Sequence, residues 1–263
     1  MNIDMTPEQR RLRDELRAYF ARMMTHELQA EIKGTEGGGP LYRVALEQMG
    51  KDGWLGVGWP KEYGGRGFTP IEQFIFSDEV QRAGYPLPFL TLNSVGPTIM
   101  QFGSEDQKKE FLPRILAGRC HFAIGYSEPS SGTDLASLTT RAVRDGDEWV
   151  VNGSKVFTSL ADFSDYIWLA VRTGPEGSKH RGISMMIVPT DAPGYSLTPI
   201  QTMGGVRTNA TYFHDVRVPV ANLVGGENNG WALIVNQLNH ERVALSAVGP
   251  LERLFEGVCD WAR

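Results

Sequence analysis

Three stretches with different hydrophobic periodicity follow one another along the chain. Near the N-terminus, apolar side chains recur at spacings of three and four, the spacing of one helix face: Leu12, Leu16, Tyr19, Phe20 and Met23. Residues 6–9 (TPEQ) form a capping box with proline at the first helical position, and residues 104–107 (SEDQ) repeat this start signal before another apolar run. Residues 53–68, rich in glycine and aromatic residues, are typical of a loop. These patterns predict a helical N-terminal domain over residues 1–120.

Short strands replace the helices after residue 120. Runs rich in β-branched and aromatic residues follow without helical spacing between them, at residues 139–143, 149–151, 156–159, 166–172, 182–188, 195–200 and 211–218. Asp145-Gly146 and Asn152-Gly153 separate the first three runs, and both dipeptides are strong hairpin signals. Six or seven consecutive strands predict an antiparallel β-barrel or sandwich, which we assign to residues 121–229.

Helical spacing returns after Gly230 and continues to Arg263. The apolar positions are Trp231, Ile234, Val235, Leu238, Val243, Leu245, Val248, Leu251, Leu254 and Val258. Gly249-Pro250 marks a place for a break. A helix with this much apolar surface needs partner helices, so we expect another chain, or sequence missing from this copy, to supply them. Residues 230–263 are therefore predicted to be the first helix of a truncated C-terminal helical bundle, and the whole chain an α+β multidomain protein.

Composition narrows the range of functions. The 263 residues carry a net charge of −5 with a pI near 5.6 and have no run of basic residues, which argues against nucleic-acid binding. No apolar stretch reaches the ~18–20 residues of a membrane span, and the charged N-terminus lacks the apolar core of a signal peptide. Cys120 and Cys259 are too few for a disulfide framework or a metal site. We therefore expect a cytoplasmic, soluble protein without structural metal, membrane contact or nucleic-acid partner.

One polar segment stands at the predicted change from helix to strand. Residues 127–134 (SEPSSGTD) bring four hydroxyl groups, two carboxylates and Gly132 together. The hydroxyls and free amides can hydrogen-bond a polar ligand, and Gly132 permits close approach of the backbone. An ordinary surface turn has the same composition, so composition leaves both interpretations open. The sequence has no G-x-G-x-x-G after a strand, no P-loop, no G-x-S-x-G and no histidine-rich ligand cluster, so these motifs name no enzyme class.

This segment and two later ones resemble the acyl-CoA dehydrogenase family. Residues 125–137 (GYSEPSSGTDLAS) are similar to the first signature of that family, and residues 152–159 (NGSKVFTS) follow at the family's distance. Residues 215–219 (DVRVP) resemble the strand that ends its middle domain. The resemblance covers the chain in order and implies a helical N-terminal domain, a β-barrel middle domain and the opening helix of a C-terminal four-helix bundle. It also implies FAD as the cofactor, which composition does not indicate.

The resemblance assigns flavin contacts to two segments. On one side of the isoalloxazine and pyrophosphate region it places Tyr126, Ser127, Gly132 and Thr133. On the other side it places a second strand with Phe157, Thr158 and Ser159. The family often has tryptophan at the position of Phe157, and phenylalanine retains the aromatic face without the indole N–H donor. Packing alone is therefore the alternative role for this side chain.

The resemblance also implies a catalytic base on the last helix. Glu241 matches one of the two positions at which family members carry their catalytic glutamate. It would remove the α-proton of an acyl thioester while the β-hydride passes to flavin N5. Arg242 matches the family arginine that contacts CoA, and Asn239 and Thr133 are further candidates for substrate binding. An exposed helix carboxylate is the alternative interpretation of Glu241.

A narrower likeness concerns one subunit type of the actinobacterial steroid side-chain acyl-CoA dehydrogenases. The similar phrases are residues 53–60 (GWLGVGWP), 122–126 (FAIGY) and 237–242 (QLNHER). This likeness implies a steroid-CoA thioester as substrate and an α2β2 heterotetramer with a paralogous chain, with a homo-oligomer as the alternative. Electron-transfer flavoprotein would accept the electrons. Two alternatives stay open: a non-catalytic partner subunit that keeps the fold, and an acyl-CoA oxidase, which shares the first half-reaction.

Overall fold

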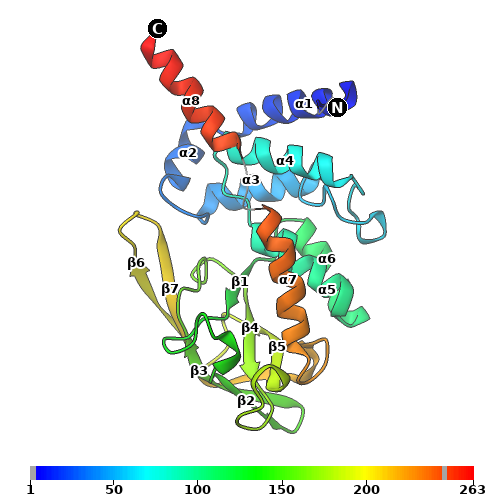
Figure 1. Cartoon of the computed structure of the whole chain (residues 1–263), viewed down its shortest axis with the longest axis vertical. Coiled ribbons are helices and arrows are strands. Elements are labelled where there is room, and N and C mark those ends of the chain that lie inside the picture. Colours follow the sequence, from blue (N-terminus) through cyan, green and yellow to red (C-terminus); the bar gives the residue numbers. More distant parts are fainter. Residues whose placement is uncertain (1–3, 245–247) are drawn as a thin grey trace.

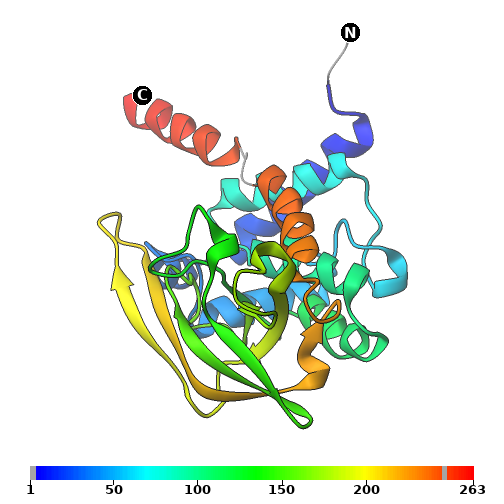
Figure 2. The same cartoon turned by 60° about the horizontal axis from the view of Figure 1, so that its bottom comes forward.

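The computed structural model describes residues 4–244 and 248–263, and the side chains of residues 240–244 lie outside that description. The helices that precede residue 120 form one body, and the strands form a second body beside it (Figure 1). Helix α7 (Gly230–Ala244) packs against both bodies, and helix α8 (Gly249–Ala262) extends away from the sheet (Figure 2). The last helices thus return to the N-terminal domain after the sheet is complete.

The N-terminal body consists of helices whose start signals lie in the sequence. They are α1 (Pro7–Met23), α2 (His26–Ile32), α3 (Pro40–Lys51), α4 (Pro70–Ala83), the π-helical η2 (Leu90–Val95), α5 (Gly96–Phe102) and α6 (Glu105–Leu116). The predicted capping boxes at Thr6 and Ser104 are confirmed, because each hydroxyl accepts a hydrogen bond from the main-chain N–H three residues later. The predicted loop over residues 53–68 is also confirmed and contains the short 3₁₀ turn η1 (Lys61–Tyr63).

The second body is one eight-stranded sheet. Its strands are β1 (Phe122–Gly125), β2 (Arg141–Asp145), β3 (Glu148–Lys155), β4 (Tyr166–Arg172), β5 (Ile183–Pro189), β6 (Tyr195–Gln201), β7 (Arg207–Pro219) and β8 (Leu223–Val224). The order is β6-β7-β3-β2-β4-β5-β8, with β1 also beside β4, and the pairings are antiparallel except those of β4 with β1 and β2. The predicted combination of a helical domain and a middle β domain is confirmed, and the end strands β6 and β8 leave the sheet open.

The structure corrects two details of the strand prediction. The Asp145-Gly146 hairpin is confirmed by the pairing of Asp145 with Glu148, but a turn at Asn152-Gly153 is wrong. Strand β3 continues through these two residues, with a bulge in its pairing with β7. Gly153 has a φ of +147°, and a Cβ atom at this position would collide with Thr140. Residues 156–159 are not a strand either, since β3 ends at Lys155 and Phe157 adopts a φ of +61°. The predicted second flavin-contacting strand is therefore a loop that follows β3.

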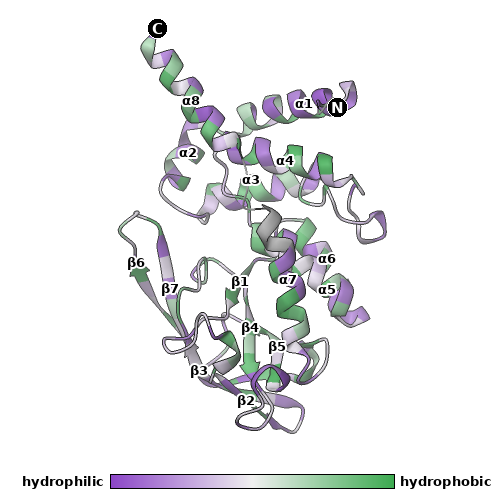
Figure 3. Cartoon of the chain, in the orientation of Figure 1, coloured by the Kyte–Doolittle hydropathy of each residue, from purple (hydrophilic) through white to green (hydrophobic). Residues whose placement is uncertain are grey.

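The C-terminal segment divides where Gly249-Pro250 allowed a break. Helix α8 begins at Gly249, and the Asp78 carboxylate of α4 accepts hydrogen bonds from the N–H groups of Val248 (3.0 Å) and Gly249 (2.7 Å). A Cβ atom at Gly249 would lie 2.3 Å from the Asp78 carbonyl oxygen, so this close approach requires glycine. Several large apolar side chains of α8 are exposed: Leu251, Leu254, Phe255, Val258 and Trp261. The colours of Figure 3 show hydrophobic and hydrophilic positions mixed along this helix. Among the described residues, no helix is long and apolar enough to cross a membrane.

Candidate active site

Three segments far apart in the sequence meet where β1 and β3 end. The main-chain N–H of Val156 donates to the carbonyl oxygen of Ser127 at 2.9 Å, which joins the loop after β1 to the loop after β3. The Tyr126 hydroxyl donates to Oε1 of Gln237 at 2.5 Å, which joins the same loop to α7. Both side chains of this second bond are buried. The structure therefore brings Tyr126 and Ser127 beside the 157–159 segment and beside the predicted catalytic helix.

A buried ion pair lies under this junction. Lys155 Nζ lies 2.9 Å from Oε1 of Glu128, and the two side chains are 0% and 2% exposed. Burial lowers the pKa of Lys155 to about 8, although the Glu128 carboxylate acts in the opposite direction. Burial also raises the pKa of Glu128, but the Lys155 charge and hydrogen bonds from Thr139 and Thr140 outweigh that effect and hold it at about 2. Both groups are therefore charged at neutral pH.

The ion pair also holds the main chain around it. Lys155 Nζ donates to the carbonyl oxygen of Tyr126 at 3.0 Å, and Glu128 accepts from the N–H groups of Thr139 (2.7 Å) and Thr140 (2.8 Å). Sequence reasoning missed this pair. The sequence pattern that could have revealed the pair is the alternation along β3, which places Lys155 on the same inward face as Trp149 and Val151. A buried cation requires a partner of opposite charge.

The remaining candidates of the first segment lie further out. Gly132 and Thr133 are exposed and directly follow a tight turn, which reciprocal main-chain bonds between Glu128 and Ser131 close. A Cβ atom at Gly132 would meet no atom within 4 Å, so the space above this residue is open in the chain as described. Residues 132 and 133 thus present exposed main chain and the Thr133 hydroxyl group at the surface.

The loop after β3 presents an aromatic side chain in a strained conformation. Phe157 is 66% exposed and has a φ of +61°, in the left-handed region of backbone conformation that residues other than glycine rarely adopt. The next residue, Thr158, is fully buried, and its N–H donates to the carbonyl oxygen of Asn209 at 2.9 Å. Ser159 is half-buried, with its hydroxyl 3.3 Å from that of Thr208. Strain and exposure together at an aromatic residue are typical of a ligand-binding position.

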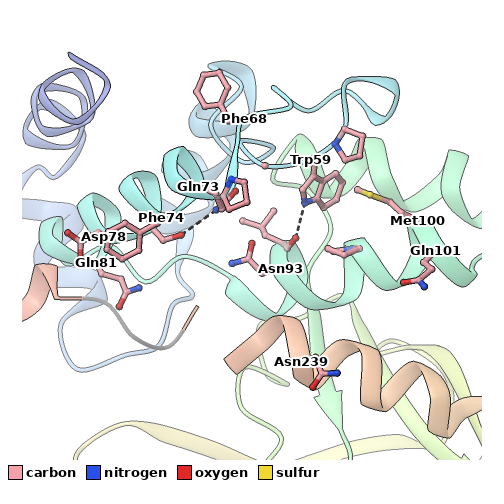
Figure 4. A pocket seen from close by; sticks show the side chains of 16 residues that line it. Trp59, Phe68, Gln73, Phe74, Asp78, Gln81, Asn93, Met100, Gln101 and Asn239 are labelled. Atoms are coloured by element: carbon pink, nitrogen blue, oxygen red, sulfur yellow. Dashed lines mark hydrogen bonds between the residues drawn. The ribbon is translucent and has the colours of Figure 1, made fainter. Parts of the chain in front are cut away.

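A cavity of about 650 Å³ lies between the N-terminal helices and α7 (Figure 4). Its wall is mostly apolar and includes Trp59, Phe68, Phe74, Leu92 and Met100. The Trp59 indole N–H donates to the Leu92 carbonyl oxygen at 2.9 Å, which fixes the ring at the wall. Asn239 of α7 also faces the cavity, as Figure 4 shows. The predicted substrate-binding residue therefore lies in the wall of an apolar cavity of ligand size.

The two remaining predictions, Glu241 and Arg242, concern side chains outside the described residues. Their backbone lies in α7, and residue 241 follows Gln237 by four positions, which is one helical turn. Gln237 is fully buried at the loop junction, and the exposed Asn239 lies at the cavity. Helix α7 thus connects the junction to the cavity, and position 241 continues the face of Gln237.

Comparison with known proteins identifies both domains of the chain. Residues 6–119 match the acyl-CoA dehydrogenase N-terminal domain, and residues 123–216 match the acyl-CoA dehydrogenase middle domain. In Mycobacterium tuberculosis, acyl-CoA dehydrogenase FadE26 is 58% identical and FadE29 is 57% identical. All of this chain matches each of them, over 67% and 68% of their lengths.

Solved structures give the same result. The "Tcur3481-Tcur3483 steroid ACAD" is 56% identical, with a TM-score of 0.95 over all of this chain and 69% of that one. The ChsE4-ChsE5 complex from Mycobacterium tuberculosis is 58% identical, with a TM-score of 0.92 over all of this chain and 67% of that one. The matches extend over both domains, and the chain therefore belongs to the acyl-CoA dehydrogenase family of oxidoreductases.

Proposed function

We propose that this chain carries out FAD-dependent α,β-dehydrogenation of an acyl-CoA thioester. The observation that carries the proposal is the placement of α7: Gln237 contacts the loop after β1, Asn239 faces the apolar cavity, and Glu241 follows one turn after Gln237. A base on this helix would lie between a cofactor held by the β domain and an acyl chain held by the helical domain.

The residues at the junction fit FAD. The exposed Phe157 ring offers a planar apolar face, and the half-buried Ser127 and Ser159 offer hydroxyl groups beside it. Thr158 is fully buried, so its proposed role is to hold the loop from beneath. The open loop at Gly132 and Thr133 offers main-chain and hydroxyl groups to the more polar part of the molecule. Bound FAD would supply the acceptor for the β-hydride.

Glu241 is the proposed base. The α-protons of a thioester are weakly acidic, so the carboxylate must be made more basic than it is in water. An apolar acyl chain that displaces water beside α7 would raise the pKa of the carboxylate, because burial disfavours its charged form. Hydrogen bonds to the thioester carbonyl would stabilise the enolate character that develops there. Arg242 and Asn239, on the same helix, are proposed to contact the CoA portion, with Thr133 as a further substrate contact.

The cavity supports a bulky acyl group. Its volume of about 650 Å³ lies within the range of pockets that enclose drug-sized ligands, and its walls come from four separate segments of the chain. Two similar solved structures contain paired chains, and one of them is described as a steroid ACAD. We therefore propose a steroid-CoA thioester as substrate and electron-transfer flavoprotein as electron acceptor.

A second chain is part of this proposal. The apolar side chains of α8 are exposed to water, which is energetically unfavourable. Further helices of a bundle would cover this surface. We propose a paralogous chain in an α2β2 assembly, in line with the paired chains of the similar complexes.

Anaerobic flavin bleaching tests the function. The chain is purified alone and with a paralogous partner chain, loaded with FAD, and mixed with straight-chain, branched and steroid acyl-CoAs. We expect a yellow complex whose visible absorption disappears fastest with the steroid thioester. A complex that binds no flavin, or that no acyl-CoA bleaches, would contradict the proposal. Rapid hydrogen peroxide formation in air would instead identify an acyl-CoA oxidase.

A further inference from the structure

The ion pair of Lys155 and Glu128 contacts the peptide group that opens residues 126–133, the candidate flavin loop. One ammonium group donates both to Glu128 Oε1 (2.9 Å) and to the carbonyl oxygen of Tyr126 (3.0 Å). The Lys155 side chain is fully buried, so water does not compete for these hydrogen bonds. A charged donor therefore holds the peptide that joins Tyr126 to Ser127.

This contact fixes the direction of the Ser127 N–H group. A trans peptide directs its C=O and N–H groups to opposite sides, and the described residues contain no cis peptide bond. Because the Tyr126 carbonyl faces the buried ammonium, the Ser127 N–H faces away from it. The Ser127 carbonyl is also held, by the Val156 N–H at 2.9 Å. The end of β3 thus holds both carbonyl groups that flank the Ser127 α-carbon.

The ammonium group also changes the strength of this donor. Hydrogen bonds in series polarise one another, and a positive charge on a carbonyl oxygen draws electron density from the amide nitrogen. The effect is larger in a buried site, where the local dielectric is low. The Ser127 N–H is therefore a stronger donor than an ordinary amide, and it suits an acceptor that gains negative charge.

Stability alone does not explain why charged residues occupy this position. A buried ion pair contributes little compared with apolar side chains of similar volume, because both charges lose their hydration. The layer contains a further buried cation, Arg172, which donates to the carbonyl oxygens of Ala136 (2.7 Å) and Leu138 (3.0 Å). Among the described residues, no carboxylate forms an ion pair with Arg172. Lys155 and Arg172 together bind the carbonyl groups of residues 126, 136 and 138, and Glu128 is their one buried carboxylate neighbour among the residues that these bonds describe. The buried side chains that hold the main chain of this segment therefore carry a net positive charge.

We propose that Lys155, held in place by Glu128, is a positioning residue of the flavin site. It orients and polarises the Tyr126–Ser127 peptide so that the Ser127 N–H donates to the edge of the flavin ring that becomes negative on reduction. The pair thereby favours reduced over oxidised flavin. This inference rests on the proposed function, since it requires FAD at the junction.

Two double variants separate this role from a structural one. Glu128→Gln with Lys155→Met removes both charges and the donor to Tyr126, whereas Glu128→Gln with Lys155→Gln removes both charges and keeps an amide donor. Neither leaves an unpaired buried charge, so both are expected to melt within a few degrees of wild type. Lys108→Met is the matched control, because it removes a lysine and its ion pair with Glu105 on α6. The measurements are the melting temperature of the apoprotein, the FAD dissociation constant and the flavin midpoint potential.

The proposal predicts that the variant without the donor loses about tenfold in its preference for reduced flavin, which is about 30 mV for a two-electron couple. The variant with the amide donor should fall between it and wild type, and Lys108→Met should match wild type. If both folded double variants keep the wild-type potential and FAD affinity, the pair is only structural and the proposal fails. If wild type itself binds no FAD, the proposed function fails instead, so the two failures are distinguishable.

Discussion

The two sides of the candidate site are held together in different ways. On the β side, the fully buried Lys155 and Glu128 bind four groups of the neighbouring main chain and side chains. On the helix side, α7 rests on the apolar side chains of Leu233 and Ile234, and the Tyr126–Gln237 bond links it to the loop. Electrostatic contacts fix the β side, whereas packing positions the helix. The proposed cofactor side is therefore pre-formed, and the position of the proposed base, Glu241, depends on how well α7 is seated.

The largest expected effect comes from the base on the helix side. Replacing Glu241 with glutamine removes the proton acceptor with little change of shape. General bases contribute about 10²–10⁴-fold to rate, so kcat and kcat/KM should fall together by that factor while FAD stays bound. Steady-state turnover and the flavin spectrum check this. Glu252→Gln on α8 is the control and should keep normal turnover, whereas wild-type turnover in Glu241→Gln would refute the assignment.

The next effect breaks the β side. Lys155→Met leaves the Glu128 carboxylate buried without its cation, which should lower the free energy of unfolding by about 3–5 kcal/mol. Urea denaturation of the apoprotein measures it. Lys108→Met, which removes a pair at the surface, should change stability by about 0.5 kcal/mol or less. Equal losses in the two variants would mean that the buried pair does not hold the β side.

A third prediction concerns the joint between the two bodies, where His121 precedes β1. Its ring nitrogens are buried without a hydrogen-bond partner among the described residues. Burial lowers its pKa to about 4, although Asp165 acts in the opposite direction and Arg43 reinforces the shift. An unfolded histidine titrates near 6.5, so the unfolded chain binds the proton more tightly. Stability should therefore be complete above pH ~6.5 and fall by about 3 kcal/mol as the pH drops towards 4.

Chemical denaturation at a series of pH values tests this joint. His121→Phe should remove most of the loss between pH 6.5 and 4, because an apolar ring has no proton to bind. The exposed His26 provides the control, and His26→Gln should keep the wild-type pH profile. The hypothesis is wrong if the profile of His121→Phe matches that of wild type.

The smallest effect is expected at the bond between the two sides. Tyr126→Phe leaves the buried Gln237 amide oxygen without its donor, at a cost of about 1–2 kcal/mol of stability. Adding Gln237→Leu should recover part of this loss, because both polar partners are then gone. If packing alone seats α7, turnover of Tyr126→Phe will equal that of wild type. A reduced kcat with unchanged FAD affinity would show that the bond positions the helix.

Local signals predicted the helices better than the strands. The capping boxes at Thr6 and Ser104 involve residues three apart, so the sequence alone defines the starts of α1 and α6. Asn152-Gly153 has the same composition as a hairpin turn, but its pairing partners lie about sixty residues later on β7. Those partners convert the expected turn into a bulge. A short-range signal cannot include that information.

The site itself was only partly predictable. The motif residues Tyr126, Ser127 and Thr158 were found by resemblance, and their proximity follows from a contact between the ends of β1 and β3. Glu128 and Lys155 are 27 residues apart, and the contact between the loop after β1 and the end of β3 brings them together. The cavity forms only when α4, α5 and α7 assemble, so no single segment could indicate it.

A crystal structure of the assembled enzyme with FAD and a steroid acyl-CoA would test the central claim most directly. The account predicts a flavin ring against Ser127 and Phe157, the acyl group in the cavity beside Asn239, and a Glu241 carboxylate oxygen about 3–3.5 Å from the thioester α-carbon. A Glu241 side chain directed into bulk solvent, or a flavin bound elsewhere on the chain, would contradict it.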